Sequence, residues 1–278
     1  MKSIIKMMRP KHWIKNLLIF IPLFFSLNLS CSKIITLVIG FLSFSMLASS
    51  IYIINDIFDV ESDRLHPEKK KRPIASGEIS IKKALIISII LIVLSFAINS
   101  LISTKIILTN ILLGLYLILN ILYSKSLKNI PVIDIFILAS GFIIRIFYGG
   151  FLVDVPISEW LLLTTLNAAL FFGIDKRKRE ENKDNVRIVL KSYTEEFLDK
   201  FSIVCISLTI MFYSLWVMNQ KNDLLYFSIP IIIFIIMQYM LTSDKEKKGD
   251  PVTVFFDNKI LIVSTMIYGL FMLFSLYY

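Results

Sequence analysis

Four side chains with oxygen ligands recur at helical spacing directly after a long apolar stretch. They are Asn55, Asp56, Asp59 and Asp63. At about 100° of rotation per residue they share an arc of about 100° on one helix face, and Glu61 points elsewhere. Carboxylates this close repel one another unless a cation lies between them. Hard oxygen ligands suit Mg²⁺, which commonly arrives with phosphate oxygens. The spacing therefore predicts a magnesium site for a phosphate-bearing ligand; the alternative is a solvated acidic helix end.

Long apolar segments must position this arc. The chain is 56% hydrophobic, above the apolar share of ordinary soluble domains. Segments long enough to cross a bilayer as helices occur at 17–30, 34–54, 81–98, 105–122, 131–152, 157–174, 200–218, 224–241 and 259–278. The sequence thus predicts an all-α polytopic membrane protein of about nine transmembrane helices, which forms a single integral-membrane domain over residues 1–278.

Basic residues divide sharply between the two ends of these spans. The N-terminal segment and the loops after the even-numbered spans hold 26 of the 30 Lys and Arg residues. Because positive residues in short loops mark the cytoplasmic side, the N-terminus and these loops are expected in the cytoplasm and the C-terminus outside. The net charge of +9 is then explained by topology and phosphate binding, and nucleic-acid binding is not expected.

A basic turn follows the acidic arc within ten residues. Pro67 ends the helix, and Pro73 and Gly77 shape a turn. Acids that hold a metal, followed by Arg or Lys for the remaining phosphate oxygens, form the composition of a diphosphate–Mg²⁺ site. Arg64 and Arg72 are the predicted phosphate ligands, whereas the run at 69–71 is equally well a positive-inside anchor.

Further polar candidates lie on later segments. Asp134 and Arg145 are the clearest charges within apolar spans, and such charges normally face the protein interior. Asp134 is expected near the cytoplasmic mouth and Arg145 at mid-span, where a structural ion pair is its alternative role. Tyr123 ends a span, and an interfacial position is equally expected for it.

The loop that begins at Asp175 is basic. As a helix it places Lys176, Arg179 and Glu180 on one face. One acid among cations suits an anion better than a second metal. Cys31 and Cys205 show no paired spacing, so neither a disulfide nor a metal site is expected from them.

The motif Asn55-Asp56-x-x-Asp59-x-x-x-Asp63 resembles the first aspartate motif of the UbiA prenyltransferase superfamily. The longer string from Asn55 to Gly77 is similar to one branch, the decaprenyl-phosphate phosphoribosyltransferases (5-phosphoribosyl-1-diphosphate: polyprenyl-phosphate transferases). Further blocks that resemble this branch are Arg9 to Asn16, Tyr123-Ser124 with Leu127-Lys128, Gly141-Phe142 with Arg145, and Lys176-Arg177. The resemblance implies a UbiA-type helical bundle with an active-site cavity that faces the cytoplasm.

The resemblance also implies a reaction. A Mg²⁺-dependent enzyme would transfer 5-phosphoribose from 5-phosphoribosyl 1-diphosphate to a polyprenyl phosphate, in the inner cell membrane and in support of cell-wall synthesis. The acceptor is already anionic, so no strong general base is required. Implied metal ligands are Asn55, Asp56, Asp59 and Asp63, with the three aspartates catalytic. Implied substrate-binding residues are Lys15, Asn16, Arg64, Arg72, Tyr123, Lys128, Asp134, Arg145, Lys176 and Arg177.

One departure bears on the substrate. Aromatic prenyltransferases of the superfamily carry a second DxxxD motif, and here that place reads Asp175-x-x-x-Arg179. A cation in place of the second acid favours substrates with additional negative charge, namely a ribose that carries a 5-phosphate and an anionic acceptor. Asp175 itself is unexpected in the phosphoribosyl branch, which leaves its part in metal binding open. Prenyl transfer to an aromatic or lipid acceptor is the first alternative; a transporter is the second, although only Arg145 supplies a mid-span charge for it. Lipid chain length and oligomeric state, with a homo-oligomer as one alternative, are left open.

Overall fold

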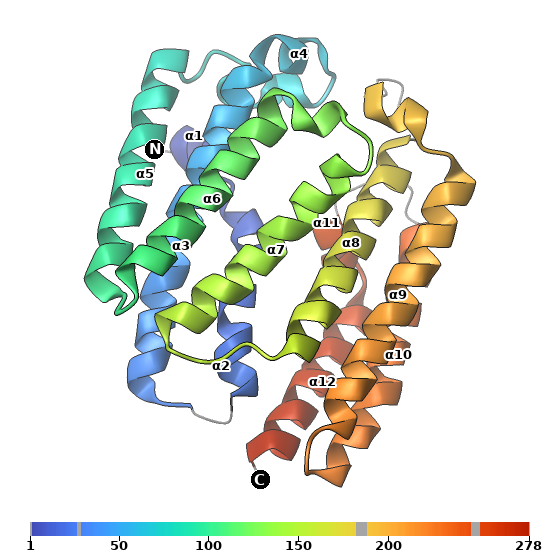
Figure 1. Cartoon of the computed structure of the whole chain (residues 1–278). Coiled ribbons are helices and arrows are strands. Elements are labelled where there is room, and N and C mark those ends of the chain that lie inside the picture. The colour runs from blue at the N-terminus through green and yellow to red at the C-terminus, as the bar shows by residue number, and fades with distance from the viewer. Residues whose placement is uncertain (1, 27–28, 182–187, 246–250, 278) are drawn as a thin grey trace. The chain divides into compact units, whose positions relative to one another are not determined.

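The computed structural model describes residues 2–26, 29–181, 188–245 and 251–277, and within these ranges every regular element is a helix (Figure 1). The expected all-α class is therefore confirmed. The elements of the first half are α1 (Lys2–Met8), η1 (Pro10–Phe20), α2 (Ile21–Phe25), α3 (Cys31–Phe58), α4 (Val60–Leu65), η2 (Lys69–Lys71), α5 (Ile81–Ile102), α6 (Ile106–Lys125) and η3 (Leu127–Asn129). Those of the second half are α7 (Ile133–Leu152), α8 (Glu159–Glu181), η4 (Ile188–Ser192), α9 (Glu195–Met218), η5 (Asp223–Phe227), α10 (Ser228–Lys245), α11 (Pro251–Asp257) and α12 (Lys259–Tyr277).

The helices group into two compact units. Unit 1 comprises residues 1–128 and 144–156, and unit 2 comprises residues 129–143 and 157–278. Helix α7 contributes its first turns to unit 2 and its later turns to unit 1. That the whole chain is a single integral-membrane domain remains a prediction.

Polar side chains fix where several helices begin. The hydroxyls of Ser30, Ser80 and Thr194 accept hydrogen bonds from backbone N–H groups three residues later, at the starts of α3, α5 and α9. These groups have no partner inside a helix, so a side-chain acceptor there stabilises the end. The caps explain why these three helices begin directly after a polar residue.

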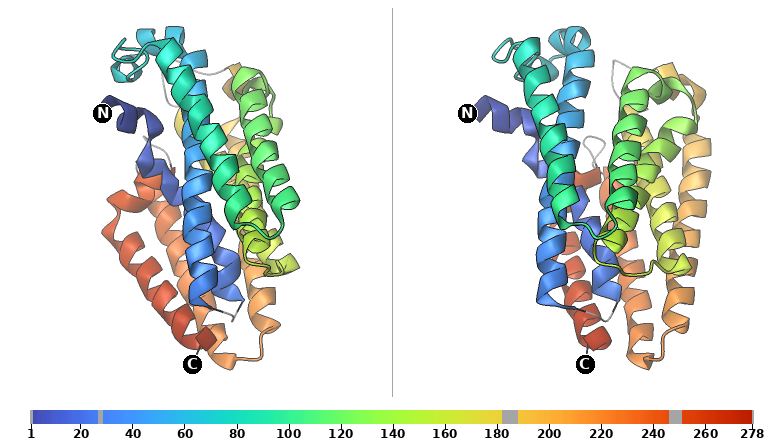
Figure 2. Two further views of the ribbon diagram at one scale, coloured as in Figure 1. Left: turned by 90° about the vertical axis from the view of Figure 1, so that its left-hand side faces the viewer. Right: turned by 60° about the vertical axis from the view of Figure 1, so that its left-hand side comes forward.

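Helix α3 is the centre of unit 1. It packs against α5, α6 and η1, and its buried residues include several small ones that permit close approach. Ser43 donates to the backbone oxygen of Ser95 on α5 at 2.8 Å. Gly149 of α7 allows a similar approach, since a Cβ there would lie 2.0 Å from the backbone oxygen of Ile19. Both views in Figure 2 show α4 and the segment after it at the end of α3, beside the start of α5.

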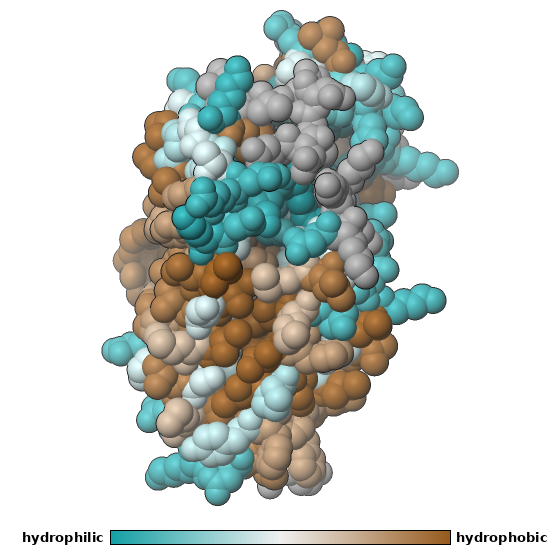
Figure 3. Space-filling model, turned by 90° about the vertical axis from the view of Figure 1, so that its right-hand side faces the viewer, coloured by the Kyte–Doolittle hydropathy of each residue, from teal (hydrophilic) through white to brown (hydrophobic). Residues whose placement is uncertain are grey.

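Unit 2 is built around α8 and α9, which pack against each other, and around α10, which packs against α12. Its core holds Phe171, Leu198, Tyr239 and Leu261. Exposed hydrophobic side chains such as Ile203, Met211, Phe234 and Met237 lie on the outer faces of α9 and α10. Figure 3 shows hydrophobic residues gathered over a broad area below a hydrophilic zone. Apolar surface of this extent is typical of helices that contact lipid.

Seven helices in the described residues are long and apolar enough to cross a membrane. They are Cys31–Phe58, Ile81–Ile102, Ile106–Lys125, Ile133–Leu152, Glu195–Met218, Asp223–Asp244 and Lys259–Tyr277. The chain is therefore a multi-pass membrane protein.

Two of the nine expected spans differ from a simple apolar helix. The segment expected at 17–30 is divided between η1 and α2, where Pro22 starts a new helix because it lacks an N–H group. The segment expected at 157–174 lies in α8, which carries Glu159 at its start and a charged end from Asp175 onward.

Candidate active site

The acidic arc lies at the junction of α3 and α4 in unit 1. Asn55 and Asp56 belong to the last turn of α3, and Asp63 belongs to α4. The two helices are separated at Asp59, yet Asp59 N donates to Asn55 O at 2.9 Å and Asp63 N to Asp59 O at 2.8 Å. Helical hydrogen bonding thus continues across the junction and keeps the four side chains near one another.

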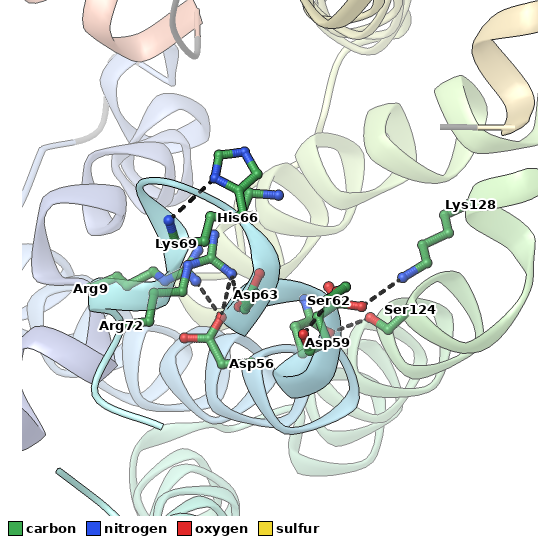
Figure 4. Close-up of polar contacts among 11 residues, drawn as sticks. Arg9, Asp56, Asp59, Ser62, Asp63, His66, Lys69, Arg72, Ser124 and Lys128 are labelled. Carbon is green, nitrogen blue, oxygen red and sulfur yellow. Dashed lines mark hydrogen bonds and ion pairs between the residues drawn. The ribbon is translucent and has the colours of Figure 1, made fainter. Parts of the chain in front are cut away.

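The arc divides into two sides (Figure 4). On one side, Asp56 and Asp63 are only 3% and 2% exposed. Nη1 of Arg72 donates to Oδ1 of Asp56 at 3.1 Å and to Oδ2 of Asp63 at 2.6 Å. Nη2 of Arg9 donates to the same oxygen of Asp56. One guanidinium nitrogen therefore lies where the two buried carboxylates converge.

On the other side, Asn55 and Asp59 turn toward the end of α6. Ser124 donates to the side-chain oxygen of Asn55, and Nζ of Lys128 donates to Oδ1 of Asp59 at 3.0 Å. Asp59 is 38% exposed along its side chain. This carboxylate is therefore reachable from solvent, whereas the other two are enclosed.

The basic turn holds Arg72 in place. Gly77 has a φ of 83°, a conformation that favours glycine. Nε of Arg64 donates to the backbone oxygen of Ala75 at 3.3 Å, so this side chain braces the turn. Nδ1 of His66 accepts hydrogen bonds from the N–H groups of Glu68 and Lys69. A ring nitrogen used in this way closes the turn and is not set up as a general base.

The donor set suits a magnesium ion, although cations of the chain itself occupy it. Among the described residues, no three His, Cys, Asp or Glu side chains are arranged as a metal site. Two buried carboxylates nevertheless converge on one nitrogen of Arg72, and the Asp59 carboxylate and the Asn55 amide lie on the other side of the arc. If Arg72 moved aside, these hard oxygens would offer Mg²⁺ its preferred ligands. The residues present fit the ion.

A second polar group of unit 1 surrounds Arg145. Its Nε donates to Oδ1 of Asn16 at 2.8 Å, and its Nη2 donates to the hydroxyl of Tyr116 at 2.8 Å. The guanidinium also lies 4.9 Å from the ring centre of Phe44, within range of a cation–π contact. Asn16 is fully buried and donates to Ser45. Asn16 and Arg145, both predicted as substrate-binding residues, therefore contact each other among the helices of unit 1. Lys15 and Tyr123, two further predicted residues, are half-buried.

Unit 2 contains a buried cluster at Asp134. Nε of Arg177 donates to Oδ2 of Asp134 at 2.6 Å, and both side chains are fully buried. Nη1 of Arg177 also reaches Glu180 at 2.5 Å. The Tyr193 hydroxyl donates to Oδ1 of Asp134 at 2.6 Å and accepts from the N–H of Val132 at 2.6 Å. Burial and the hydrogen bond to Asp134 raise the pKa of Tyr193 above its ordinary value, so its hydroxyl stays protonated as a donor.

Asp175 lies in a separate buried cluster of unit 2. Its Oδ2 accepts from Nε of Arg179 at 3.0 Å and from the hydroxyl of Tyr239 at 2.7 Å. Its Oδ1 accepts from Ser243. Both carboxylate oxygens are thus engaged by donors within the unit. Lys176, the remaining predicted anion ligand of this loop, is half-exposed.

Sequence reasoning missed several residues of these clusters as individual site residues, among them Arg9, Ser124 and Tyr193. Arg9 lies 47 positions from Asp56, and Ser124 lies 69 positions from Asn55. Arg9 and Ser124 fall within the sequence blocks that carried the family resemblance, which was the available signal. Tyr193 carried no such signal.

Comparisons with known proteins agree with this fold. The UbiA prenyltransferase family matches residues 18–264, and the chain belongs to that family. It is 32% identical to the decaprenyl-phosphate phosphoribosyltransferase of Corynebacterium glutamicum, over 94% of this chain and 82% of the relative. It is 31% identical to the enzyme of the same name from Mycolicibacterium smegmatis, over 93% of this chain and 87% of the relative.

A solved structure of a UbiA homolog from Archaeoglobus fulgidus, bound to GPP and Mg²⁺, is also similar. Its TM-score is 0.75 at 20% identity, over 99% of both chains. At this identity the likeness shows the fold. The chain is thus a membrane transferase of the UbiA family, and the resemblance inferred from its motifs is confirmed.

Proposed function

We propose that the protein transfers 5-phosphoribose from 5-phosphoribosyl 1-diphosphate to a polyprenyl phosphate, giving polyprenyl-phosphoryl ribose-5-phosphate and diphosphate. The nearly full-length similarity to two decaprenyl-phosphate phosphoribosyltransferases supports this choice of substrates. The structural observation that supports it most strongly is that the Asp175 carboxylate is fully engaged by other side chains. Its two oxygens are taken by Arg179, Tyr239 and Ser243, so the place of a second metal-binding acidic motif holds a neutralised pair.

The arc at the α3–α4 junction would bind the donor's diphosphate. Asn55, Asp56, Asp59 and Asp63 would hold a Mg²⁺ ion; a UbiA homolog of this fold was solved with Mg²⁺ bound. The ion would stabilise negative charge on the departing diphosphate. Arg72, which already lies between two of the acids, and Arg64 would bind phosphate oxygens. Lys15, Lys128, Arg145, Lys176 and Arg177 are proposed for the other anionic groups, with Asn16, Tyr123 and Asp134 as further substrate contacts.

The bond changes need no proton acceptor. The bond between ribose C1 and the diphosphate oxygen breaks, and its electron pair leaves with diphosphate. An oxygen of the polyprenyl phosphate forms the new bond to C1. That oxygen is already anionic, so the reaction needs no general base. His66 is therefore not required as one, and its Nδ1 is engaged by the backbone of the turn.

The lipid acceptor would enter from the bilayer. We place the N-terminus and the acidic arc on the cytoplasmic side and the C-terminus outside, in the inner cell membrane, because Lys and Arg concentrate in the corresponding segments. The nine-span arrangement and the cytoplasm-facing cavity are part of this proposal. A water-soluble sugar donor in the cytoplasm and a lipid acceptor in the membrane then meet at one surface.

Prenyl transfer is the alternative within the same family. GPP, which is bound in the archaeal homolog, is a prenyl diphosphate. Two labelled donors separate the alternatives. Membranes that contain the protein are incubated with labelled phosphoribosyl diphosphate or with labelled prenyl diphosphate. We expect label from the sugar donor to enter lipid. Label that enters only from the prenyl donor would replace phosphoribosyl transfer with prenyl transfer.

A further inference from the structure

The cation nearest the buried end of the acidic arc comes from the N-terminal segment. Arg9 connects α1 to η1, and its guanidinium bonds Asp56. Its side chain is 24% exposed, compared with 3% for Asp56. Arg9 therefore reaches from a partly open position onto an enclosed carboxylate (Figure 4).

A second contact holds Arg9 at this place independently of Asp56. Its backbone has φ 52° and ψ 58°, a left-handed conformation that is uncommon outside glycine, so the contact that keeps its side chain near the arc must come from the side chain itself. Its guanidinium also lies 5.2 Å from the ring centre of Tyr52, one turn before Asp56 on α3. A cation over an aromatic ring is attracted electrostatically. The side chain would thus remain near the arc if its carboxylate partner were taken away.

The charged side chains of the arc balance one another. Three carboxylates, those of Asp56, Asp59 and Asp63, face three cations, Arg9, Arg72 and Lys128. A divalent cation that bound the carboxylates would leave the group with two positive charges in excess. Those charges would be carried by side chains that had just lost their carboxylate partners. Diphosphate supplies the compensating negative charge and accepts hydrogen bonds from guanidinium groups.

We propose that Arg9 exchanges partners when the donor binds: it neutralises Asp56 before binding and bonds the diphosphate once a divalent cation has taken that carboxylate. The proposal rests on the proposed function for its metal–diphosphate site, but not on the sugar. Arg9 thereby becomes a diphosphate-binding residue. It also competes with the metal, so that a divalent cation without diphosphate binds more weakly than the oxygen ligands alone would allow.

The exchange predicts that loss of the Arg9 charge changes the affinities for two ligands in opposite directions. Removal of the Arg9 charge eliminates the competitor and should strengthen binding of a divalent cation alone. The same change removes a diphosphate ligand and should weaken binding of diphosphate in the presence of Mg²⁺. A residue that merely supported the fold would weaken both.

The experiment uses the full chain, purified in detergent, with two titrations. Mn²⁺ alone is titrated and followed by electron paramagnetic resonance, and inorganic diphosphate is titrated at saturating Mg²⁺ by calorimetry. The variants are Arg9→Gln, Arg9→Lys and the control Lys6→Gln. Lys6 lies on the same N-terminal segment and bonds the backbone oxygen of Lys71, so its loss removes one charge without touching the arc.

We expect Arg9→Gln to bind Mn²⁺ several-fold more tightly than the wild type. Its affinity for diphosphate at saturating Mg²⁺ should fall by a factor of about ten or more, as for loss of a charge-assisted hydrogen bond. Arg9→Lys should bind Mn²⁺ like the wild type and recover part of the diphosphate affinity, and Lys6→Gln should change neither. If Arg9→Gln leaves both affinities unchanged or weakens both, the exchange is refuted while the metal site stands. If the wild type itself binds neither ligand, the metal assignment and the exchange both fail. A prenyl donor in place of a sugar donor would leave the result unaffected.

Discussion

Arg177 and Asp134 form an ion pair at 2.6 Å, although both side chains are fully buried. The two residues are 43 positions apart in the chain. Their pairing joins the end of α8 to the start of α7 within unit 2. Removal of one partner from such a pair leaves an uncompensated buried charge. The pair therefore acts on stability, whatever part it also has in substrate binding.

Asp134→Ala should lower the free energy of unfolding by about 3–5 kcal/mol, the range for breaking a buried pair. Tyr193→Phe, which removes the hydroxyl that donates to Asp134 and accepts from the N–H of Val132, should cost about 1–3 kcal/mol. Thermal unfolding of the purified variants in detergent measures both. An Asp134→Ala protein as stable as the wild type would contradict the structural role of the pair.

Asp59→Asn should reduce the rate by about 100-fold or more while the protein stays folded in the membrane. A metal contributes several kcal/mol of charge stabilisation, and about 1.4 kcal/mol corresponds to a tenfold rate change. Glu61→Gln is the matched control, because Glu61 lies in the first turn of α4, is exposed and points away from the arc by its helical phase. Initial rates at saturating Mg²⁺ compare the two. Near-full activity of Asp59→Asn would remove Asp59 from the metal site.

Asp175→Asn should lower stability and leave the Mg²⁺ dependence of the rate unchanged. The reason is that Arg179, Tyr239 and Ser243 already engage both carboxylate oxygens. The Mg²⁺ concentration for half-maximal rate is the quantity to measure. A marked increase in that concentration would show that Asp175 is a metal ligand after all and would favour a prenyl donor.

Much of the fold followed from the sequence because membrane helices carry a strong local signal. Apolar length and basic loops identified a polytopic helical protein, and helical spacing placed Asn55, Asp56, Asp59 and Asp63 at one helix end. The division of the first span was not predicted, since Pro22 and a 3₁₀ segment alter geometry without altering apolar content. Local patterns report local structure.

The partners of the charged residues were beyond the reach of sequence spacing. Arg72 was predicted beside the acids, and nine residues separate it from Asp63. Arg9, by contrast, meets Asp56 only through the packing of η1 and α1 on α3. Arg177 was predicted as an anion ligand on the basis of its charge, and only tertiary structure reveals that Asp134 and Glu180 engage it. Residues on one helix face recur at a regular spacing that can be recognised in the sequence, whereas contacts between distant residues follow no such spacing.

In the proposed reaction, a metal held by the acidic arc would draw diphosphate from a sugar carbon. The decisive experiment uses purified protein, a polyprenyl phosphate and phosphoribosyl diphosphate labelled either at the 5-phosphate or in the diphosphate. We expect the 5-phosphate label to enter lipid, the diphosphate label to be released into water, and chelation of Mg²⁺ to stop both. Lipid that acquires no 5-phosphate label, or acquires it equally well without a divalent cation, would contradict the proposed reaction.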